Sequence, residues 1–207
     1  MKTPVVLLAN GERPKNPKTL DFINNASSII CADGGYELAK LINVQPTVII
    51  GDFDSTDPNH ASLQDNSLIK IIKAEDQNKS DLEKAIEYCI SVNIDLITLI
   101  AATGKRDDHT LANFLLMIDY LEQIEIQIMT DYYLINVVKG EKKYHASVNT
   151  QISLVSFEVE NFITTKGLKF NLNREKLKTS THGISNSTVH EQFSVFSEKP
   201  LILFRKI

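Results

Sequence analysis

The first two thirds of the chain alternate short, branched apolar segments with stretches of helical spacing. The apolar segments lie at residues 5–10, 28–33, 47–52, 68–73, 95–102 and 124–130. Several are apolar at successive rather than alternate positions, which is typical of strands covered on both faces. This alternation predicts an α/β unit with a mainly parallel sheet and helices on its faces.

Two helices can be placed within this region. Over residues 81–92, one face repeats with helical spacing and consists of Leu82, Ala85, Ile86, Cys89 and Ile90. Ser80 and Glu83 form the S-x-x-E box that begins such a helix. A second helix is predicted at about 110–121, with an inward face of Leu111, Phe114, Leu115 and Ile118.

The pattern changes after about residue 135. Short alternating segments follow, separated by Gly, Asn, Lys and Pro, at 150–158, 167–173, 191–197 and 201–207. We predict an α/β domain over residues 1–135 and a small, sandwich-like all-β domain over 136–207.

Composition narrows the class of protein. Of 207 residues, 43% are hydrophobic and 23% charged, as in a soluble globular protein, and the net charge of −4 gives no reason to expect a nucleic-acid partner. No apolar run approaches the ~20 residues of a membrane span, and the start lacks a signal-peptide pattern. Cys31 and Cys89 are far apart and in apolar surroundings, so we expect reduced core residues. We therefore expect a cytoplasmic protein without a membrane partner.

Acidic residues follow four consecutive predicted strands. Asp33 follows the second strand, Asp52 and Asp54 follow the third, and Asp81 lies in the segment after the fourth. The loop after the fifth strand carries Thr103, Gly104, Arg106, Asp107, Asp108 and His109. Ligands of parallel α/β sheets bind outside the carboxyl ends of the strands, so these acids should meet at one edge.

Such a cluster is unfavourable unless some of the acids are protonated or a cation lies among them. Two carboxylates ~4 Å apart repel by roughly 4 kcal/mol at an effective dielectric of 20. Oxygen ligands without cysteine favour Mg²⁺ over Zn²⁺. Lys79, Lys105 and Arg106 would supply positive charge for phosphates, and Gly34, Gly35 and Gly104 would allow close approach to the backbone.

Each of these signals also has a purely structural interpretation. A D-x-D pair after a strand is often a turn or helix cap, "ADGG" alone is a turn signal, and Asp81 could merely favour the helix dipole. "TGKR" lacks the upstream glycine of a phosphate-binding loop, and His109 suits a loop hydrogen bond better than a metal. The functional interpretation depends on four weak signals that fall on one predicted edge.

Six blocks, in this order, resemble the thiamine pyrophosphokinase family. They read "CADGG", "PTVIIGDFDS", "DQNKSDLEKAI", "ATGKRDDHTLAN", "TTKGLKFNL" and "GISN", and the resemblance spans about residues 28–207. It implies an N-terminal α/β domain and a C-terminal β-sandwich in a homodimer. The implied reaction moves the β,γ-diphosphate of ATP onto the hydroxyethyl oxygen of thiamine and releases AMP, with Mg²⁺ as the metal ion.

The resemblance also assigns roles to residues. It implies that Asp52, Asp54 and Asp81 are catalytic and bind the metal, and that Asp108 is a further catalytic acid. The implied ATP-binding residues are Asp33, Gly34, Gln77, Lys79, Thr103, Gly104 and Arg106. Ser185 and Asn186 resemble the family's thiamine contacts, which are expected at the dimer interface.

The chain departs from the family pattern in the loop after the fifth strand. Lys105 replaces one of two paired glycines, and Asp107 replaces an apolar residue. The family's acid could therefore be Asp107 or Asp108, and the spacing to His109 favours Asp108. The chain has no Trp, so a ring that stacks on thiamine must be a Phe or Tyr, which the sequence leaves unassigned. Either Asp81 or Asp54 could accept the thiamine proton.

Two other functions fit parts of the sequence. "VIIGDFDST" also fits a haloacid-dehalogenase-like phosphatase, with Asp52 as nucleophile and Asp54 as acid and base, although those enzymes place the nucleophile on their first core strand. A non-catalytic nucleotide- or thiamine-binding module is the third possibility.

Overall fold

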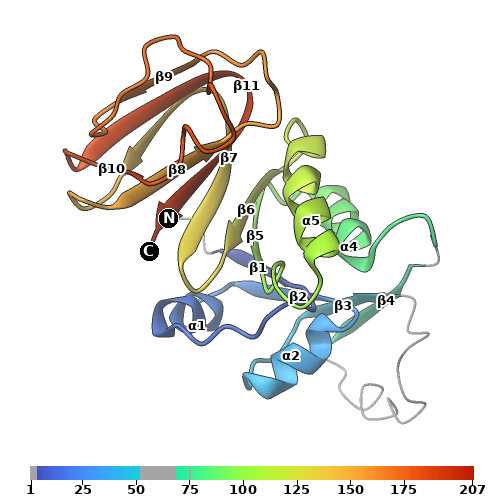
Figure 1. The fold of residues 1–207 in the computed structure, drawn as a ribbon. Helices are drawn as coiled ribbons and strands as arrows, with labels where there is room; N and C mark the ends of the chain where they lie inside the picture. The colour runs from blue at the N-terminus through green and yellow to red at the C-terminus, as the bar shows by residue number, and fades with distance from the viewer. Residues whose placement is uncertain (1–3, 52–68, 75) are drawn as a thin grey trace. The chain divides into compact units, whose positions relative to one another are not determined.

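The computed structural model describes residues 4–51, 69–74 and 76–207 and divides the chain into two compact units (Figure 1). The units are Met1–Asp131 and Tyr132–Ile207, whereas the sequence pattern predicts a boundary at residue 135. The first is an α/β unit and the second an antiparallel β unit, which confirms the predicted fold class.

A parallel sheet forms the centre of the N-terminal unit. Its strands within the described residues are β1 (Val5–Leu8), β2 (Ser28–Ala32), β3 (Val48–Gly51), β4 (Lys70–Lys73), β5 (Leu96–Ile100) and β6 (Glu125–Met129). They lie in the order β6-β5-β1-β2-β3-β4, and every neighbouring pair is parallel. β1, β2, β3 and β5 are almost wholly buried, as expected for strands covered on both faces.

Helices cover both faces of this sheet. The described helices are α1 (Pro17–Asn24), α2 (Gly35–Leu41), α4 (Asp81–Ser91) and α5 (Asp107–Asp119). α1 and α2 lie on one side of the sheet and α4 and α5 on the other (Figure 1). This agrees with the strand order, because strands are added from β1 to β3 in one direction and from β5 to β6 in the other, and parallel strands are joined by right-handed crossovers. The direction reverses between β1 and β5.

α4 begins as the sequence predicts. The Ser80 hydroxyl accepts a hydrogen bond from the Glu83 amide at 3.2 Å. The buried residues of this helix are Leu82, Lys84, Ala85, Ile86 and Cys89. The predicted apolar face is thus confirmed apart from Ile90, which is only partly buried, and a lysine lies within it.

The predicted inward face of α5 is wrong in part, since Phe114 and Ile118 are partly buried and the two leucines are exposed. Leu111 and Leu115 are 52% and 39% exposed, whereas Asn113 and Met117 are buried. The helix carries apolar residues on more than one face, so periodicity alone does not fix its rotation. A tertiary contact does: Asn113 donates from Nδ2 to the carbonyl oxygen of Ala102 at 2.7 Å, which turns the Asn113 side of the helix towards the loop after β5.

The C-terminal unit is antiparallel. Its described strands are β7 (Tyr133–His145), β8 (Gln151–Val155), β9 (Ile163–Lys166), β10 (Asn186–Ser187) and β11 (Gln192–Lys206). They lie in the order β10-β8-β11-β7, and β9 pairs with β11. Alternate residues enclose a core that includes Ile152, Leu154, Val195, Leu201 and Leu203. The two segments predicted at 191–197 and 201–207 form one strand with a register shift between Ser197 and Leu201.

The strand predicted at residues 167–173 is wrong. β9 ends at Lys166, and Gly167 turns the chain with φ +82°. The Thr165 amide then donates to the Leu172 carbonyl at 2.9 Å, and the Leu172 amide donates to Thr165 Oγ1 at 2.8 Å. These bonds close a tight loop. "GLKFNLN" therefore has the alternating pattern of a strand but forms a loop, in which Leu168 is buried.

Both cysteines are free and buried, as expected from their surroundings. Within the part of the chain that the structure describes, no helix is long and apolar enough to cross a membrane.

Candidate active site

A cavity of about 220 Å³ lies at the carboxyl end of the parallel sheet. Its walls come from the segments after β1, β2 and β5 and from the starts of α4 and α5, with Asn10, Asp33, Asp81 and Arg106 among the lining residues. β1 and β5 are the strands between which the chain direction reverses. Ligands of doubly wound sheets bind at such a switch point.

Backbone hydrogen bonds fix the two loops that meet at the switch point. The Gly11 amide donates to the Ala101 carbonyl at 2.6 Å, and the Glu12 amide donates to the Thr103 carbonyl at 2.7 Å. A Cβ atom at Gly11 would lie 2.3 Å from both carbonyl oxygens, so only glycine permits this approach. The cavity wall is therefore held by backbone rather than by mobile side chains.

The turn after β2 places Asp33 at the cavity. Asp33 has φ 27°, and its amide donates to the Ile50 carbonyl at 2.7 Å. A Cβ at Gly34 would lie 2.2 Å from Asn10 Nδ2. "ADGG" is thus a turn, as its purely structural interpretation predicts. The turn also places a carboxylate and a glycine backbone without a side chain at the cavity.

Asp81, at the start of α4, shares the cavity with Asp33. Its Oδ1 accepts a hydrogen bond from Lys84 Nζ at 3.1 Å. The lysine side chain is 5% exposed and that of Asp81 is 31% exposed. A buried lysine needs a charge partner, so Lys84 orients the Asp81 carboxylate from the protein interior.

The loop after β5 adds positive charge. Gly104 has φ +79°, and Lys105 has φ 60°, a conformation that favours glycine. The lysine that replaces a family glycine therefore keeps the glycine-like backbone. Its Nζ donates to Asn10 Oδ1 at 3.1 Å, so it also joins the loops after β1 and β5.

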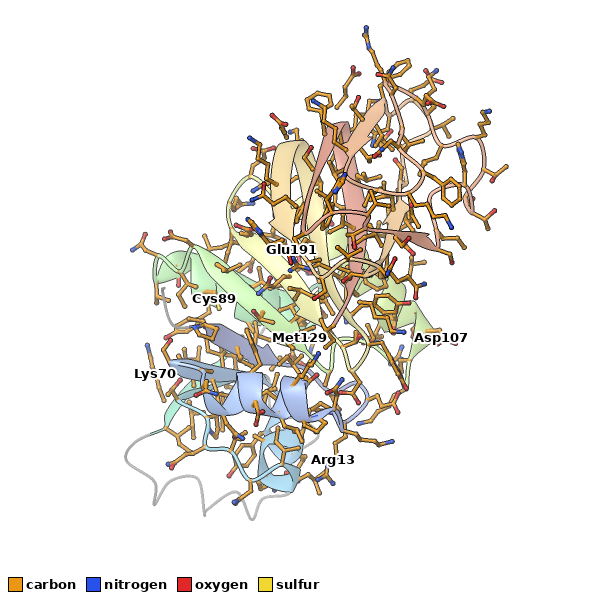
Figure 2. All side chains as sticks on the ribbon, turned by 90° about the vertical axis from the view of Figure 1, so that its left-hand side faces the viewer. Arg13, Lys70, Cys89, Asp107, Met129 and Glu191 are labelled. Carbon is orange, nitrogen blue, oxygen red and sulfur yellow. The ribbon has the colours of Figure 1, made fainter. Side chains whose placement is uncertain are left out.

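Arg106 holds Asp108 at the start of α5. Its Nε donates to Asp108 Oδ1 at 3.1 Å and its Nη2 to Oδ2 at 2.5 Å, while both side chains are more than 60% exposed. This bidentate pair and the His109 amide lower the pKa of Asp108 to about 2. Arg106 lines the cavity and Asp108 does not. Asp107, labelled in Figure 2, begins the helix and is exposed.

Three predicted ATP-binding residues are not among the lining residues. Thr103 uses its carbonyl to bind the Glu12 amide, and Gln77 is exposed in the segment before α4. Lys79 donates from Nζ to Glu87 Oε1 at 2.5 Å, a bond that raises the pKa of Lys79. The roles of these residues towards ATP stay predictions.

The predicted thiamine contacts lie in the C-terminal unit. Ser185 has φ 60°, and its amide donates to Ser153 Oγ at 3.0 Å. The Asn186 side chain binds the backbone of Phe170 on both sides: Oδ1 accepts from the Phe170 amide at 3.1 Å, and Nδ2 donates to its carbonyl at 2.7 Å. Phe170 is 66% exposed. Asn186 therefore holds a loop that presents an aromatic ring to solvent.

Asp52 and Asp54 lie outside the described residues. Over residues 4–51, 69–74 and 76–207, no three His, Cys, Asp or Glu side chains form a metal-binding group. The described part of the chain thus brings together five predicted site residues, which are Asp33, Gly34, Asp81, Gly104 and Arg106. The predicted metal ligands Asp52 and Asp54 stay predictions.

Sequence reasoning missed three polar residues at or beside the cavity. Asn10 lies just after β1 and is not an acid, so the pattern of acidic residues at strand ends does not include it. Lys84 interrupts the apolar face of its helix, which is an unusual place for a charge unless it is paired. Asn113 is a polar residue on the buried side of α5, and a pattern of apolar residues does not point to it.

Comparison with known families accounts for most of the chain. Residues 19–129 match the family described as "Thiamin pyrophosphokinase, catalytic domain", and residues 134–202 match "Thiamin pyrophosphokinase, vitamin B1 binding domain". The chain belongs to the thiamine pyrophosphokinase family. It is therefore an enzyme of this type, which argues against the phosphatase and the non-catalytic module.

Individual relatives agree with this family. The chain is 26% identical over 213 residues to a thiamine pyrophosphokinase of Bacillus subtilis, with 99% of each chain covered. It is 27% identical to thiamine pyrophosphokinase 2 of Oryza sativa, with 84% of this chain and 75% of the relative covered.

Solved structures of the family share the fold. The crystal structure of thiamine pyrophosphokinase from Bacillus subtilis has a TM-score of 0.81 at 23% identity and covers 99% of both chains. The thiamin pyrophosphokinase of Geobacillus thermodenitrificans has a TM-score of 0.82 at 23% identity and covers 99% of this chain and 98% of its own.

Proposed function

We propose that the protein transfers the diphosphate group of ATP to thiamine in a magnesium-dependent reaction that forms thiamine diphosphate and AMP. The observation that carries this proposal is the cavity at the switch point of the parallel sheet, where Asp33 and Asp81 lie with the cationic Lys105 and Arg106. Opposite charges in one cleft suit a polyphosphate that arrives with a divalent cation.

The donor set fits magnesium. Carboxylate oxygens are available at the cavity, and cysteine is absent from its described lining. Mg²⁺ prefers oxygen ligands and is usually held by one or two carboxylates together with substrate phosphates. We propose Asp81 as one holder and Asp52 and Asp54 as the others. When bound, the ion would neutralise charge that develops on the polyphosphate during transfer.

In the proposed step, the thiamine hydroxyl oxygen bonds to the β-phosphorus of ATP. The bond between that phosphorus and the oxygen bridging to the α-phosphate breaks, and AMP leaves with that oxygen. Arg106 and Lys105 would bind phosphate oxygens and hold the reacting groups in line. The thiamine proton would pass to Asp81 or Asp54, and a loose transition state requires little help from this base.

For ATP, we propose contacts from Asp33, Gly34, Gln77, Lys79, Thr103, Gly104 and Arg106. Gly34 and Gly104 line the cavity without side chains, so their backbone would let the nucleotide approach closely. We propose Asp108 as the further catalytic acid. Its bond to Arg106 supports Asp108 over Asp107, because it couples the carboxylate to a cation that lines the cavity.

For thiamine, we propose a site at Ser185 and Asn186, at the interface of a homodimer. Phe170 supplies an exposed ring that Asn186 fixes in place, and such a ring could stack on the thiamine pyrimidine. Because the chain has no Trp, the ring that stacks on thiamine must be a Phe or Tyr, and we propose Phe170. A cytoplasmic location remains our proposal from the sequence.

The deciding experiment is a product assay. Purified protein incubated with ATP, Mg²⁺ and thiamine should yield AMP and thiamine diphosphate in equal amounts, measured by chromatography. ADP with thiamine monophosphate would contradict diphosphate transfer, and free phosphate with a trapped aspartyl-phosphate would favour the phosphatase.

Variants then test the carboxylates. Asp52→Asn, Asp54→Asn and Asp81→Asn should each abolish magnesium-dependent AMP release while circular dichroism stays unchanged. Asp119→Asn is the matched control, because Asp119 is an exposed residue of α5 outside the cavity. Near-normal turnover in all three variants would remove the metal assignment.

A further inference from the structure

A second hollow, of about 440 Å³, lies within the C-terminal unit. Its walls are formed by the end of β7, the end of β9 with Gly167, and the start of β11 with the segment before it. Its volume falls in the range of roughly 300–1,000 Å³ that small-molecule sites occupy. None of its lining residues belongs to the proposed transfer machinery.

The strand register places two lysines in one row on either side of a serine. Lys143 of β7 pairs with Ser194 of β11, and Ser194 pairs with Lys166 of β9. Directly paired residues on neighbouring strands point to the same face, and strands lie about 4.8 Å apart. The two lysine Cα atoms are therefore about 10 Å apart, with a hydroxyl between them.

The rest of the lining adds further basic groups. His145 pairs with Gln192 in the neighbouring row on the same face, and His190 lies two residues before Gln192 in the chain. The lining contains no carboxylate. Glu141 and Glu191, the latter labelled in Figure 2, are the carboxylates next to it in sequence, and both are exposed. Neither lysine makes an ion pair with a described residue, so their charges are available to a ligand.

The wall behind this row is rigid. Phe193 is 3% exposed and stacks on Tyr144 with ring centroids 5.2 Å apart. A Cβ at Gly167 would lie 2.5 Å from the Gln192 carbonyl oxygen, so glycine lets β9 close tightly on the start of β11. The cationic row is thus mounted on a packed sheet rather than on mobile loops, which lowers the cost of ordering it around a ligand.

We propose that this hollow binds a small molecule through a diphosphate group. Lysine ammonium groups bind phosphate oxygens as point charges, and the Ser194 hydroxyl can donate a hydrogen bond between them. An extended anion suits two lysines that flank a serine better than a single small anion does. The site is independent of the proposed reaction, because its residues lie outside the cavity of the α/β unit.

The test is a titration of the full-length protein with inorganic diphosphate, without magnesium or thiamine, followed by amide resonances in two-dimensional NMR. Amides of Lys166, Gly167, Gln192 and Ser194 should shift together and give one dissociation constant. Amide resonances at the cavity of the α/β unit show separately whether diphosphate binds there. The absence of binding at the hollow can therefore be distinguished from the absence of binding at the cavity.

The double variant Lys143→Ala/Lys166→Ala should raise the dissociation constant at the hollow by about tenfold or more. The control Lys142→Ala/Lys178→Ala removes the same net charge. Lys142 pairs with the buried Val195, so its side chain points to the face of the sheet opposite to that of Lys143. The control should bind as the parent does. Absent shifts at millimolar diphosphate, or equal weakening in both double variants, would overturn the site.

A second titration with ADP identifies what the diphosphate is attached to. Tighter binding of ADP than of inorganic diphosphate would support a nucleotide as the ligand. Equal binding would support recognition of the diphosphate group alone. Loss of the local shifts with both ligands would refute the proposal.

Discussion

The ammonium of Lys84 lies 3.1 Å from Asp81 Oδ1, with 5% of the lysine side chain exposed. Lys40 and Glu37 on α2 have the same three-residue separation in sequence and also form an ion pair, but their side chains are 49% and 59% exposed. Exposed pairs contribute about 0–1 kcal/mol, whereas removal of one partner from a buried pair is costly. The first pair therefore fixes a carboxylate at the cavity, and the second is a solvated helix pair.

Lys84→Met keeps most of the side-chain volume and removes the charge. We expect the free energy of unfolding to fall by about 1–3 kcal/mol, since Asp81 retains some solvent, and kcat to fall about tenfold or more as the carboxylate loses its orientation. Urea unfolding and the AMP-release assay measure the two effects.

Lys40→Met is the matched control for this change. It should alter the free energy of unfolding by less than about 0.5 kcal/mol and leave kcat unchanged. Equal effects of the two substitutions on kcat would contradict a positioning role for Lys84.

Two substitutions at Lys105 distinguish the effect of its backbone conformation on stability from the effect of its charge on ATP binding. At φ 60°, glycine is favoured over other residues by about 1 kcal/mol. Lys105→Gly should therefore be more stable than Lys105→Ala by about that amount, the reverse of the usual order in helices. Both variants lose the ammonium, so both should raise the KM for ATP similarly.

Thermal unfolding and steady-state kinetics on the two variants check this. If the alanine variant is the more stable one, the left-handed conformation of residue 105 is refuted. A normal KM for ATP in both variants would instead remove Lys105 from the phosphate site.

Asp108 should stay ionised far below neutral pH. Arg106 lowers the pKa of its carboxyl from 3.8 to about 2. Because the folded-state pKa is the lower one, the contribution of the pair to stability is complete above pH 3.8 and is lost as the pH falls through about 2. No step in activity between pH 5 and 9 should come from this group.

Carbon NMR titration of the Asp108 carboxyl measures this pKa directly. In Arg106→Ala the pKa should rise towards 3.8, because the main stabilising hydrogen bonds are removed. Lys79→Ala is the control and should leave the pKa of Asp108 unchanged, since Lys79 donates a hydrogen bond to Glu87 and forms an ion pair with Asp76. An unshifted pKa in Arg106→Ala would show that the pair does not persist in solution.

The burial of the two thiols gives a prediction of reactivity. Burial raises the pKa of both Cys31 and Cys89 to about 12, and both residues are 0% exposed. The thiolate is the reactive form, so neither should react with Ellman's reagent at pH 8 in the folded protein. In urea both should react, and fast reaction of the native protein would contradict the packing of β2 or α4.

The parts of the molecule that the sequence predicted are those set by local pattern. Apolar runs identified the described parallel strands, and Ser80 marked the start of α4 because a cap acts within one helical turn. The strand-end rule brought Asp33, Asp81 and Arg106 to one cavity, since it depends on topology rather than on detailed packing.

The parts that were missed are set by tertiary contacts. The rotation of α5 depends on Asn113 bonding to Ala102, and no pattern of apolar residues contains that information. The alternation of "GLKFNLN" is that of a strand, yet Gly167 and the bonds between Thr165 and Leu172 make it a loop. The role of Asn186 as a clamp on Phe170 also appears only when distant segments are brought together.

That clamp leads to a prediction about thiamine. Phe170→Ala should raise the KM for thiamine about five- to tenfold with little change in kcat, since one aromatic stack contributes about 1 kcal/mol. Asn186→Ala should raise it similarly if Asn186 acts by holding Phe170. The double variant should then be no worse than either single variant, because both changes remove one interaction. Phe157→Ala, another exposed aromatic of the same unit, is the control. Additive effects in the double variant would mean that Asn186 contacts thiamine itself.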